Sequence, residues 1–346
     1  MKYLLSITLV CLPIILKSQS LDEFTYNWEA SEQTKKERVS RDTLRLDSVL
    51  LALEAEEFYE FAYLDADNDG NLAFYNFTRD RIIILPSNNY SEYKELGNGR
   101  GRGPGEIELA RDIKFNDSGS LWLVDLENIN IQKWNSYGDL EKNFKPRKKH
   151  LRPYRIAVCE EFLYILSEQY LKDGLYHRLN FSGDVINSFK LIENKKKETE
   201  RLWRNASYFR GDIQCDGEDL VHVGTYKNYI RKYSKNGELK FSKKIIGPDV
   251  NPEPLLYMSK RSRGRKENVK TLSGNVEIVG DKIFVSHSGK KRWYYHLDIY
   301  DNNGEYLESY YFKHPVQEFT TNGKYLYTIE YHKSDANHYI ARYLLP

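Results

Sequence analysis

One strand pattern recurs six times along this chain and leaves few folds open to it. The pattern is two apolar strands joined by a turn rich in Asp, Asn or Gly, then a strand ending in aromatic-x-x-x-Gly, and a final strand, which the last copy lacks. The copies begin near residues 61, 111, 154, 211, 275 and 316. In the clearest copy, 111–144, NDSG (116–119) and NSYG (135–138) are turn signals between alternating apolar and polar runs. This pattern predicts an all-β protein.

Repeats of about forty residues have the size of a four-stranded propeller blade. We therefore predict a six-bladed β-propeller over residues 41–346, with blades from about residue 58. The last copy, 316–346, holds only three strands. Because an unpaired edge strand invites aggregation, an N-terminal strand is expected to close the ring. Residues 43–48 (TLRLDS) alternate correctly and are the candidate for this closing strand.

The composition favours strands and gives no reason to expect nucleic acid as a partner. The chain has 28 Tyr and 15 Phe but only 2 Met, and aromatic residues are enriched in β-sheets. The formal net charge is +2, and it falls to about zero without Lys2 and Lys17. A near-neutral chain has no overall attraction for a polyanion.

The first twenty residues have the layout of a secretory signal peptide. Lys2 precedes an apolar run over 3–16, and small polar residues follow it at 18–20. Cys11 lies inside the apolar run, which is not the context of a lipidation site. Residues 21–40 are expected to form an N-terminal arm with little structure of its own. No later run approaches the ~20 apolar residues that span a membrane, so we expect an exported, periplasmic or extracellular protein, and a monomer.

The stretch GNGRGRGPGE (97–106) lies between the first and second copies. A chain that crosses sharply from one blade to the next needs positive φ angles, which glycine adopts without penalty. The spacing matches neither G-x-G-x-x-G nor a P-loop, and no βαβ unit surrounds it. The stretch is therefore interpreted as a crossing rather than a phosphate site.

A family resemblance supports the predicted fold. GRGPGE (101–106), LWLVD (121–125), Asn128 and IQKWNSYG (131–138) resemble the NHL-type repeat and the bacterial exported six-bladed, TolB-like β-propellers. The match is sharpest over 97–144 and continues as periodicity to 346. It implies export and a six-bladed fold, and, more loosely, a binding role. The long connectors 193–207 and 246–273 depart from the pattern, and such insertions are where function is often added.

The connectors between copies carry most of the positive charge. They sum to +11, whereas the rest of the mature chain sums to about −11. A basic face would attract polyanions such as an acidic glycan or an acidic protein, although loop lysines and arginines are often merely solvated. Noncatalytic binding through this face is the favoured function, and its candidate residues are Lys145, Arg147, Lys148, Lys149, Arg152, Lys260, Arg261, Arg263, Arg265 and Lys266.

One loop has part of a calcium-binding pattern. Asp65, Asp67 and Asp69 have the alternate spacing of carboxylates in a calcium loop. The pattern is incomplete, because Asn76 stands where an EF-hand needs Glu and Ala73 where a shorter loop needs Asp. A tight turn is the preferred interpretation, and no cofactor is expected beyond this weak calcium candidate.

The alternative function is a metal-dependent, lactonase-like or lyase-like enzyme with its site in the central channel. Such a site would use carboxylate, Asn and His side chains from inner strands. The mid-chain and later histidines show no H-x-x-x-H spacing, and no G-x-S-x-G is present. A Ser-His-Asp set assembled from distant positions stays open. The histidines concerned are His222, His287, His296, His314, His332 and His338.

Two cysteines remain after the signal peptide, Cys159 and Cys215. They appear at equivalent points of the third and fourth copies, where the rotation of the ring would hold them further apart than the ~4.4–6.8 Å between Cα atoms that a disulfide needs. Free, buried thiols are therefore expected.

Overall fold

The computed structural model describes residues 30–53, 61–171, 174–189, 210–225, 229–246, 273–288 and 294–346. Every element of regular secondary structure assigned within these ranges is a β-strand. They form four sheets of four strands each and one sheet of eight strands. No helix in the described part of the chain is long and apolar enough to cross a membrane.

Each four-stranded sheet is an antiparallel meander of strands that follow one another in the sequence. The first contains β3 (Phe61–Ala66), β4 (Leu72–Asn76), β5 (Arg81–Leu85) and β6 (Lys94–Leu96). The second contains β7 (Ala110–Phe115), β8 (Leu121–Asp125), β9 (Asn130–Trp134) and β10 (Leu140–Phe144). The third contains β11 (Pro153–Val158), β12 (Leu163–Leu171), β13 (Gly174–Leu179) and β14 (Val185–Phe189). The fourth contains β15 (Gly211–Asp216), β16 (Asp219–Gly224), β17 (Tyr229–Tyr233) and β18 (Leu239–Lys244).

The eight-stranded sheet contains the remaining strands. They are β19 (Ser273–Val279), β20 (Lys282–His287), β21 (Tyr294–Asp301), β22 (Tyr306–Thr321), β23 (Tyr325–His332), β24 (Asn337–Leu344), β2 (Leu46–Leu53) and β1 (Ser40–Thr43). Six separate four-stranded sheets were predicted. The hydrogen bonds of the described residues instead give four such sheets and one sheet of eight strands. The reason is β22, which runs unbroken from the fifth sequence copy into the sixth because only residues 313–315 separate them.

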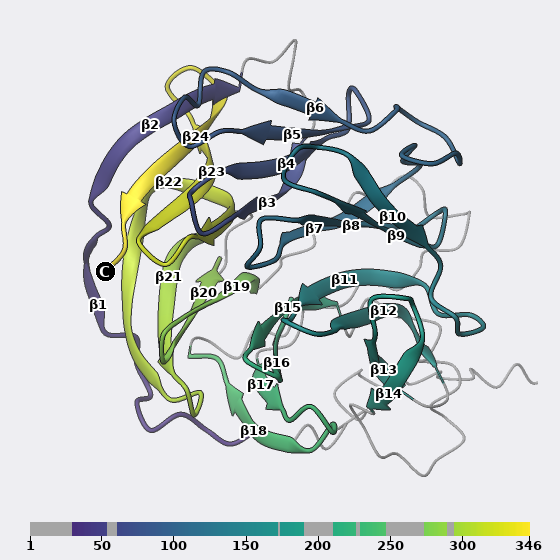
Figure 1. The fold of residues 1–346 in the computed structure, drawn as a ribbon. Helices are drawn as coiled ribbons and strands as arrows, with labels where there is room; N and C mark the ends of the chain where they lie inside the picture. The colour runs from purple at the N-terminus through teal and green to yellow at the C-terminus, as the bar shows by residue number, and fades with distance from the viewer. Residues whose placement is uncertain are drawn as a thin grey trace, which may run out of the picture.

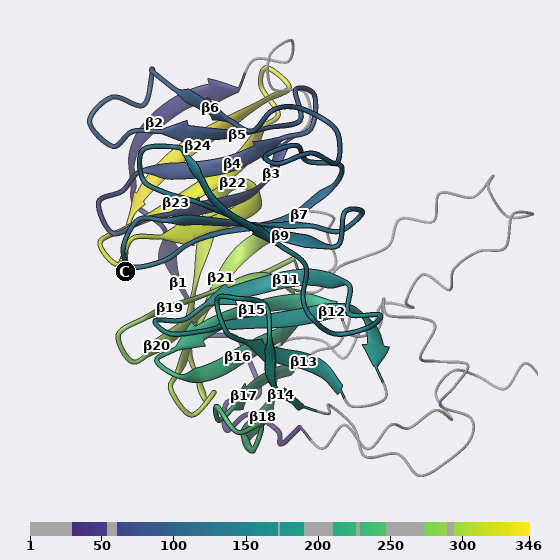
Figure 2. The same ribbon diagram turned by 45° about the vertical axis from the view of Figure 1, so that its right-hand side comes forward.

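The sheets are arranged like the blades of a propeller around a common axis (Figure 1), and the turned view shows the sheets stacked side by side (Figure 2). Neighbouring sheets bury apolar side chains between their faces. Ala73 and Tyr75 of the first sheet, for example, share a cluster with Leu121 and Trp134 of the second. Middle strands such as β8 are buried at every position, because they have a neighbouring sheet on both faces.

Asparagine and aspartate side chains hold the tight turns between strands, as the sequence predicted. Asn135 Oδ1, for example, accepts the N–H groups of Tyr137 and Asp139 at 3.0 and 2.8 Å. The crossing over 97–106 is also confirmed, because Gly97, Gly99 and Gly105 have φ angles of 99°, 88° and 75° between β6 and β7.

The strand that pairs with the last strand of the chain is β2. It runs antiparallel to β24, from Leu46 opposite Tyr343 to Leu53 opposite His338, and Figure 1 shows the two side by side. The segment predicted for this role, 43–48, overlaps β2 only at 46–48. Residues 43–45 instead end β1 and lead into β2, since β1 pairs in parallel with β22.

The described part of the N-terminal arm is fastened to the fourth and fifth sequence copies. The amide of Gln33 donates to the carbonyls of Lys244 and Gly304 at 2.7 and 2.9 Å. Arg38 forms an ion pair with the buried Asp298 at 2.7 Å. An arm with few regular elements is thus held by side-chain contacts.

Candidate functional site

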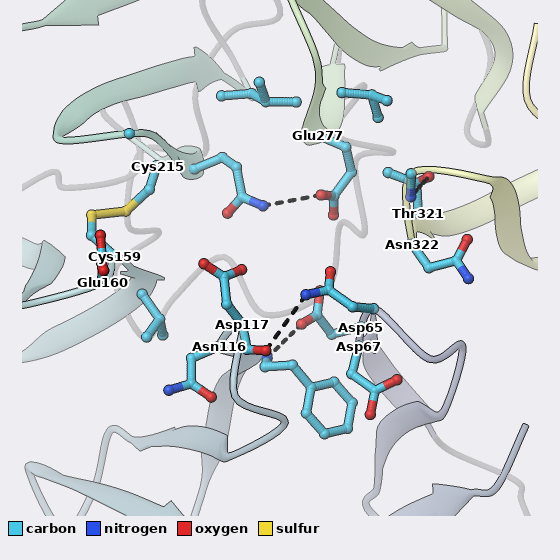
Figure 3. A pocket seen from close by; sticks show the side chains of 18 of the residues that line it. Asp65, Asp67, Asn116, Asp117, Cys159, Glu160, Cys215, Glu277, Thr321 and Asn322 are labelled. Carbon is cyan, nitrogen blue, oxygen red and sulfur yellow. Dashed lines mark hydrogen bonds between the residues drawn. A yellow bond between two sulfur atoms is a disulfide. The ribbon is translucent and has the colours of Figure 1, made fainter.

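A cavity of about 620 Å³ opens at one end of the axis (Figure 3). Its walls come from the ends of the first strands and the turns that follow them in successive copies. Every charged residue that lines it is acidic, and amide side chains supply much of the remaining polar surface. We call this cavity the acidic mouth, and its charged residues are Asp65, Asp67, Asp117, Glu160, Glu161, Glu218 and Glu277.

The floor of the acidic mouth is a buried polar layer centred on Lys114. The ammonium of Lys114 lies 3.4 Å from a carboxylate oxygen of Asp65 and 3.4 Å from one of Glu277. Gln214 donates to the other oxygen of Glu277 at 3.1 Å, and the hydroxyl of Thr320 donates to Asp65 at 3.2 Å. These side chains come from β3, β7, β15, β19 and β22, so residues far apart in the sequence meet in one buried layer beneath the mouth.

The layer holds one ammonium against two carboxylates. Burial raises the pKa of Asp65, and it raises the pKa of Glu277 to about 8 although Lys114 opposes it. Burial would lower the pKa of Lys114, but Glu277 and Asp65 raise it well above its ordinary value. The expected state near neutral pH is therefore a charged Lys114 beside a protonated Glu277.

A series of side-chain to backbone hydrogen bonds joins neighbouring inner strands around the channel. In each, a side-chain oxygen of one strand accepts a backbone N–H of the next. The pairs are Glu318 with Leu64, Asp65 with Phe115, Asp112 with Ile156, Asp212 with Val276 and Asn275 with Phe319, at 3.0, 2.6, 2.8, 2.9 and 3.3 Å. These side-chain oxygens therefore link the inner strands to one another, and each already accepts a backbone hydrogen bond.

The junction between β11 and β15 has a disulfide, Cys159–Cys215, on the wall of the mouth. The prediction of free thiols was wrong. Cys159 follows the end of β11 whereas Cys215 lies within β15, so the two are not at equivalent points. Their Cα atoms are 5.7 Å apart, within the range that a disulfide needs.

The rim of the mouth carries exposed acids that make no ion pair among the described residues. They are Asp117, Glu160 and Glu161. Glu218, by contrast, pairs with Lys235 at 2.7 Å. Unpaired carboxylates at the edge of a concave surface give a negative potential that draws cations in.

The three aspartates of the calcium candidate have separate roles. Asp65 belongs to the buried layer. Asp67 Oδ1 accepts the N–H groups of Asp69 and Asn71 at 3.0 and 2.8 Å, which holds the tight turn between β3 and β4. The described residues contain no group of three or more His, Cys, Asp or Glu that could hold a metal ion. The turn interpretation is confirmed, and calcium binding stays an untested prediction.

The predicted basic face is only partly within the described residues. Lys260, Arg261, Arg263, Arg265 and Lys266 lie outside them. In the loop before β11, Arg147 pairs with Asp184 at 3.0 Å, Arg152 pairs with Glu168 at 3.1 Å, and Lys148 donates to Ser188 at 2.8 Å. Lys145 and Lys149 of the same loop are exposed. Because this loop precedes β11 whereas the mouth follows it, the two lie at opposite ends of the strand.

The histidines are spread over several sheets. His222 is fully buried beside the hydroxyl of Tyr176, and burial lowers its pKa to about 3. His287 is opposite His296 in β20 and β21, and His314 is stacked on His332 with ring centroids 3.7 Å apart. None of these residues lines the acidic mouth.

Sequence reasoning missed the acids of the mouth because it read the turns after the first strands only as turns. A signal was nevertheless present. Acidic residues follow the first strand in each of the first four copies, at Asp67, Asp117, Glu160 with Glu161, and Glu218. Aligning the copies would have placed them at one end of the axis.

Several solved structures resemble this fold. A member of the DUF4221 family from Bacteroides vulgatus is 12% identical, with a TM-score of 0.56 over 90% of this chain and 99% of that one. A putative exported protein from Bacteroides fragilis is 12% identical, with a TM-score of 0.53 over 89% and 99%. A gluconolactonase from Xanthomonas campestris is 10% identical, with a TM-score of 0.54 over 90% and 98%. The chain folds as a β-propeller. At these identities the likeness shows the fold alone.

No family model matches the chain. A curated protein, 8-amino-7-oxononanoate synthase from Alkaliphilus metalliredigens, is 32% identical over 105 residues. The match covers 27% of this chain, which spans only 27% of that relative's length. It carries no statement about activity.

Proposed function

We propose that this protein is an exported, noncatalytic binding module whose acidic mouth takes a positively charged ligand. The main observation behind this proposal is that every charged residue lining the 620 Å³ cavity is acidic. Carboxylates and amides are the groups that recognise ammonium and guanidinium ions. This site lies at the opposite end of β11 from the basic loop 145–152.

We also infer that the ring has six blades. Contacts between inner strands run in a circle from β3 to β7, β11, β15, β19 and β22, and back to β3. The first part of β22 pairs with β21 and its last part with β23, so this one strand would serve as the outer strand of a fifth blade and the inner strand of a sixth. On this count β2 supplies the fourth strand of the sixth blade and closes the ring.

Export is supported by three independent features. The first twenty residues have the signal-peptide layout, and the disulfide suits an oxidising compartment. A structure of the same fold is described as a putative exported protein.

A noncatalytic role is favoured because the inner carboxylates already accept hydrogen bonds. Asp65 and Glu277 hold Lys114, and Asp112 accepts the N–H of Ile156. The alternative remains a metal-dependent lactonase-like or lyase-like enzyme, which one propeller of similar fold represents. Stoichiometric calcium or zinc in the purified protein would favour that alternative.

Removing the rim charges is expected to weaken cation binding. The triple variant Asp117→Asn, Glu160→Gln, Glu161→Gln should lower the affinity for trilysine about tenfold at low salt, since each exposed charge contributes roughly 0.5 kcal/mol. Calorimetric titration at two salt concentrations measures this, and added salt should weaken the wild type more than the variant.

The control changes the same net charge elsewhere. Glu37→Gln, Asp42→Asn, Glu92→Gln neutralises three exposed acids that do not line the mouth. It should bind trilysine almost as the wild type does. Equal losses in the two triple variants would mean that only net charge matters, and the proposed site would be rejected.

The basic connector face has its own test. Lys145→Ser, Lys149→Ser is expected to lower the salt concentration at which the protein elutes from heparin. Lys36→Ser, Lys313→Ser, which removes two other exposed lysines, should leave elution nearly unchanged. If both pairs elute as the wild type does, this loop is merely solvated.

A further inference from the structure

A smaller hollow lies beside the acidic mouth, between the first and second sheets. It has a volume of about 130 Å³ and shares two lining residues with the mouth, Asp67 and Phe115. We call it the side groove. Its other walls come from β5, β6 and the turns at 119–121 and 135–138.

The side groove is largely apolar. Ile84, Leu96 and Leu121 line it, and Leu96 and Leu121 are buried. Tyr137 stands at its rim with 84% of its surface exposed, the highest value among the large apolar and aromatic residues described as exposed. The turn holds the backbone there, because the N–H of Tyr137 donates to Asn135 at 3.0 Å. An exposed aromatic ring beside an apolar hollow is typical of a recognition surface.

Charge sets the direction of an occupant. Two charged residues line the described part of the groove, Asp67 and Lys94. Asp67 also lines the mouth, whereas Lys94 does not. Lys94 would repel an ammonium within the groove, and the acids of the mouth would attract one. An occupant that satisfies both is positively charged in the mouth and uncharged and apolar in the groove.

We propose that the ligand is a basic peptide segment in which lysine or arginine is followed or preceded by an apolar residue. The basic side chains occupy the acidic mouth, and the apolar side chain lies in the side groove against Leu96 and the ring of Tyr137. This inference rests on the proposed function and adds the ligand class to it. A simple oligoamine would fill only the mouth.

Two capped peptides of equal charge test this inference. Acetylated and amidated LKKKL carries leucine at both ends, so it serves either chain direction, whereas SKKKS lacks the apolar side chains. LKKKL is expected to bind the wild type about five- to tenfold more tightly than SKKKS, which is the gain from burying much of one leucine side chain.

Variants of the groove rim separate the two contributions. Tyr137→Ser removes the exposed ring, and Ser136→Trp places a large side chain over the groove at an exposed position. Each should abolish the advantage of LKKKL while leaving the affinity for SKKKS unchanged. Ile186→Ser is the matched control, because Ile186 is 51% exposed and lines neither cavity.

The outcomes distinguish the two proposals. If both peptides bind the wild type equally and both depend on the rim acids, the groove inference is overturned and the proposed function stands. If neither peptide binds, both are overturned. An advantage for LKKKL that survives in Tyr137→Ser and Ser136→Trp would also overturn the groove assignment.

Discussion

Replacing Lys114 with methionine is expected to lower the free energy of unfolding by about 3–5 kcal/mol at pH 8, because two buried carboxylates lose their common partner. Lys114 is 5% exposed and lies 3.4 Å from both Asp65 and Glu277. Methionine fills much of the same volume. The lost free energy of unfolding is therefore due more to the missing charge than to a cavity.

The loss of unfolding free energy in Lys114→Met should grow as the pH rises. The pKa of Glu277 is raised to about 8 by burial, so the folded protein holds a proton that the unfolded chain releases above its ordinary value of 4.5. Such a group stabilises the fold less and less as pH rises from about 4.5 to 8. Lys114 opposes this rise in the pKa of both Asp65 and Glu277. Lys114→Met should therefore raise both pKa values further, and its deficit in the free energy of unfolding should be about 1 kcal/mol near pH 5 and largest at pH 8.

Urea unfolding of both proteins at pH 5 and pH 8 measures this difference. Lys240→Met is the control, because Lys240 pairs with Asp219 at the surface and is 49% exposed. Lys240→Met should leave the free energy of unfolding nearly unchanged at either pH, because an exposed ion pair contributes little. A deficit in Lys114→Met that is small, or equal at both pH values, would contradict the account of the channel floor.

Removing the disulfide is the second change with a large expected effect. Cys159 and Cys215 are 56 residues apart, and closing a loop of that length stabilises a fold by about 4 kcal/mol in the chain-entropy model. The double variant Cys159→Ser, Cys215→Ser should lose about that much free energy of unfolding. The bond also joins the end of β11 to β15.

Reduced wild type is the natural comparison for the double variant. The two should unfold at similar urea concentrations, well below oxidised wild type, and hydrogen exchange should rise first along β11 and β15. Oxidised wild type and double variant with the same midpoint would show that the bond contributes little to stability.

The repeat made the propeller predictable, and the limits of that prediction have physical causes. Strand alternation, turn residues and the Gly-rich crossing at 97–106 are local signals, and each appears in the structure. The continuity of β22 was not predicted because KHP (313–315) contains a proline and reads as a connector. The chain nevertheless stays extended there, as proline itself allows. The disulfide was missed because a shift of one residue between Cys159 and Cys215 decides their separation.

The candidate site was harder to predict than the fold. The sequence favoured the long basic connectors, because their positive charge lies in local runs. The acids of the mouth are single residues in short turns, and Asp67 and Asp117 there look like ordinary turn formers. Their importance depends on a ring that brings residues 65 and 323 to one opening, which no local pattern reveals.

Mapping the contact site of a photoreactive trilysine on the wild-type protein tests the central claim most directly. After irradiation and proteolysis, mass spectrometry should locate the cross-links in the turns that form the acidic mouth, at 65–68, 116–117, 160–162, 217–218 and 321–323. Excess unlabelled trilysine should suppress them. Cross-links concentrated at 145–152, or scattered over the surface, would contradict the acidic mouth as the binding site.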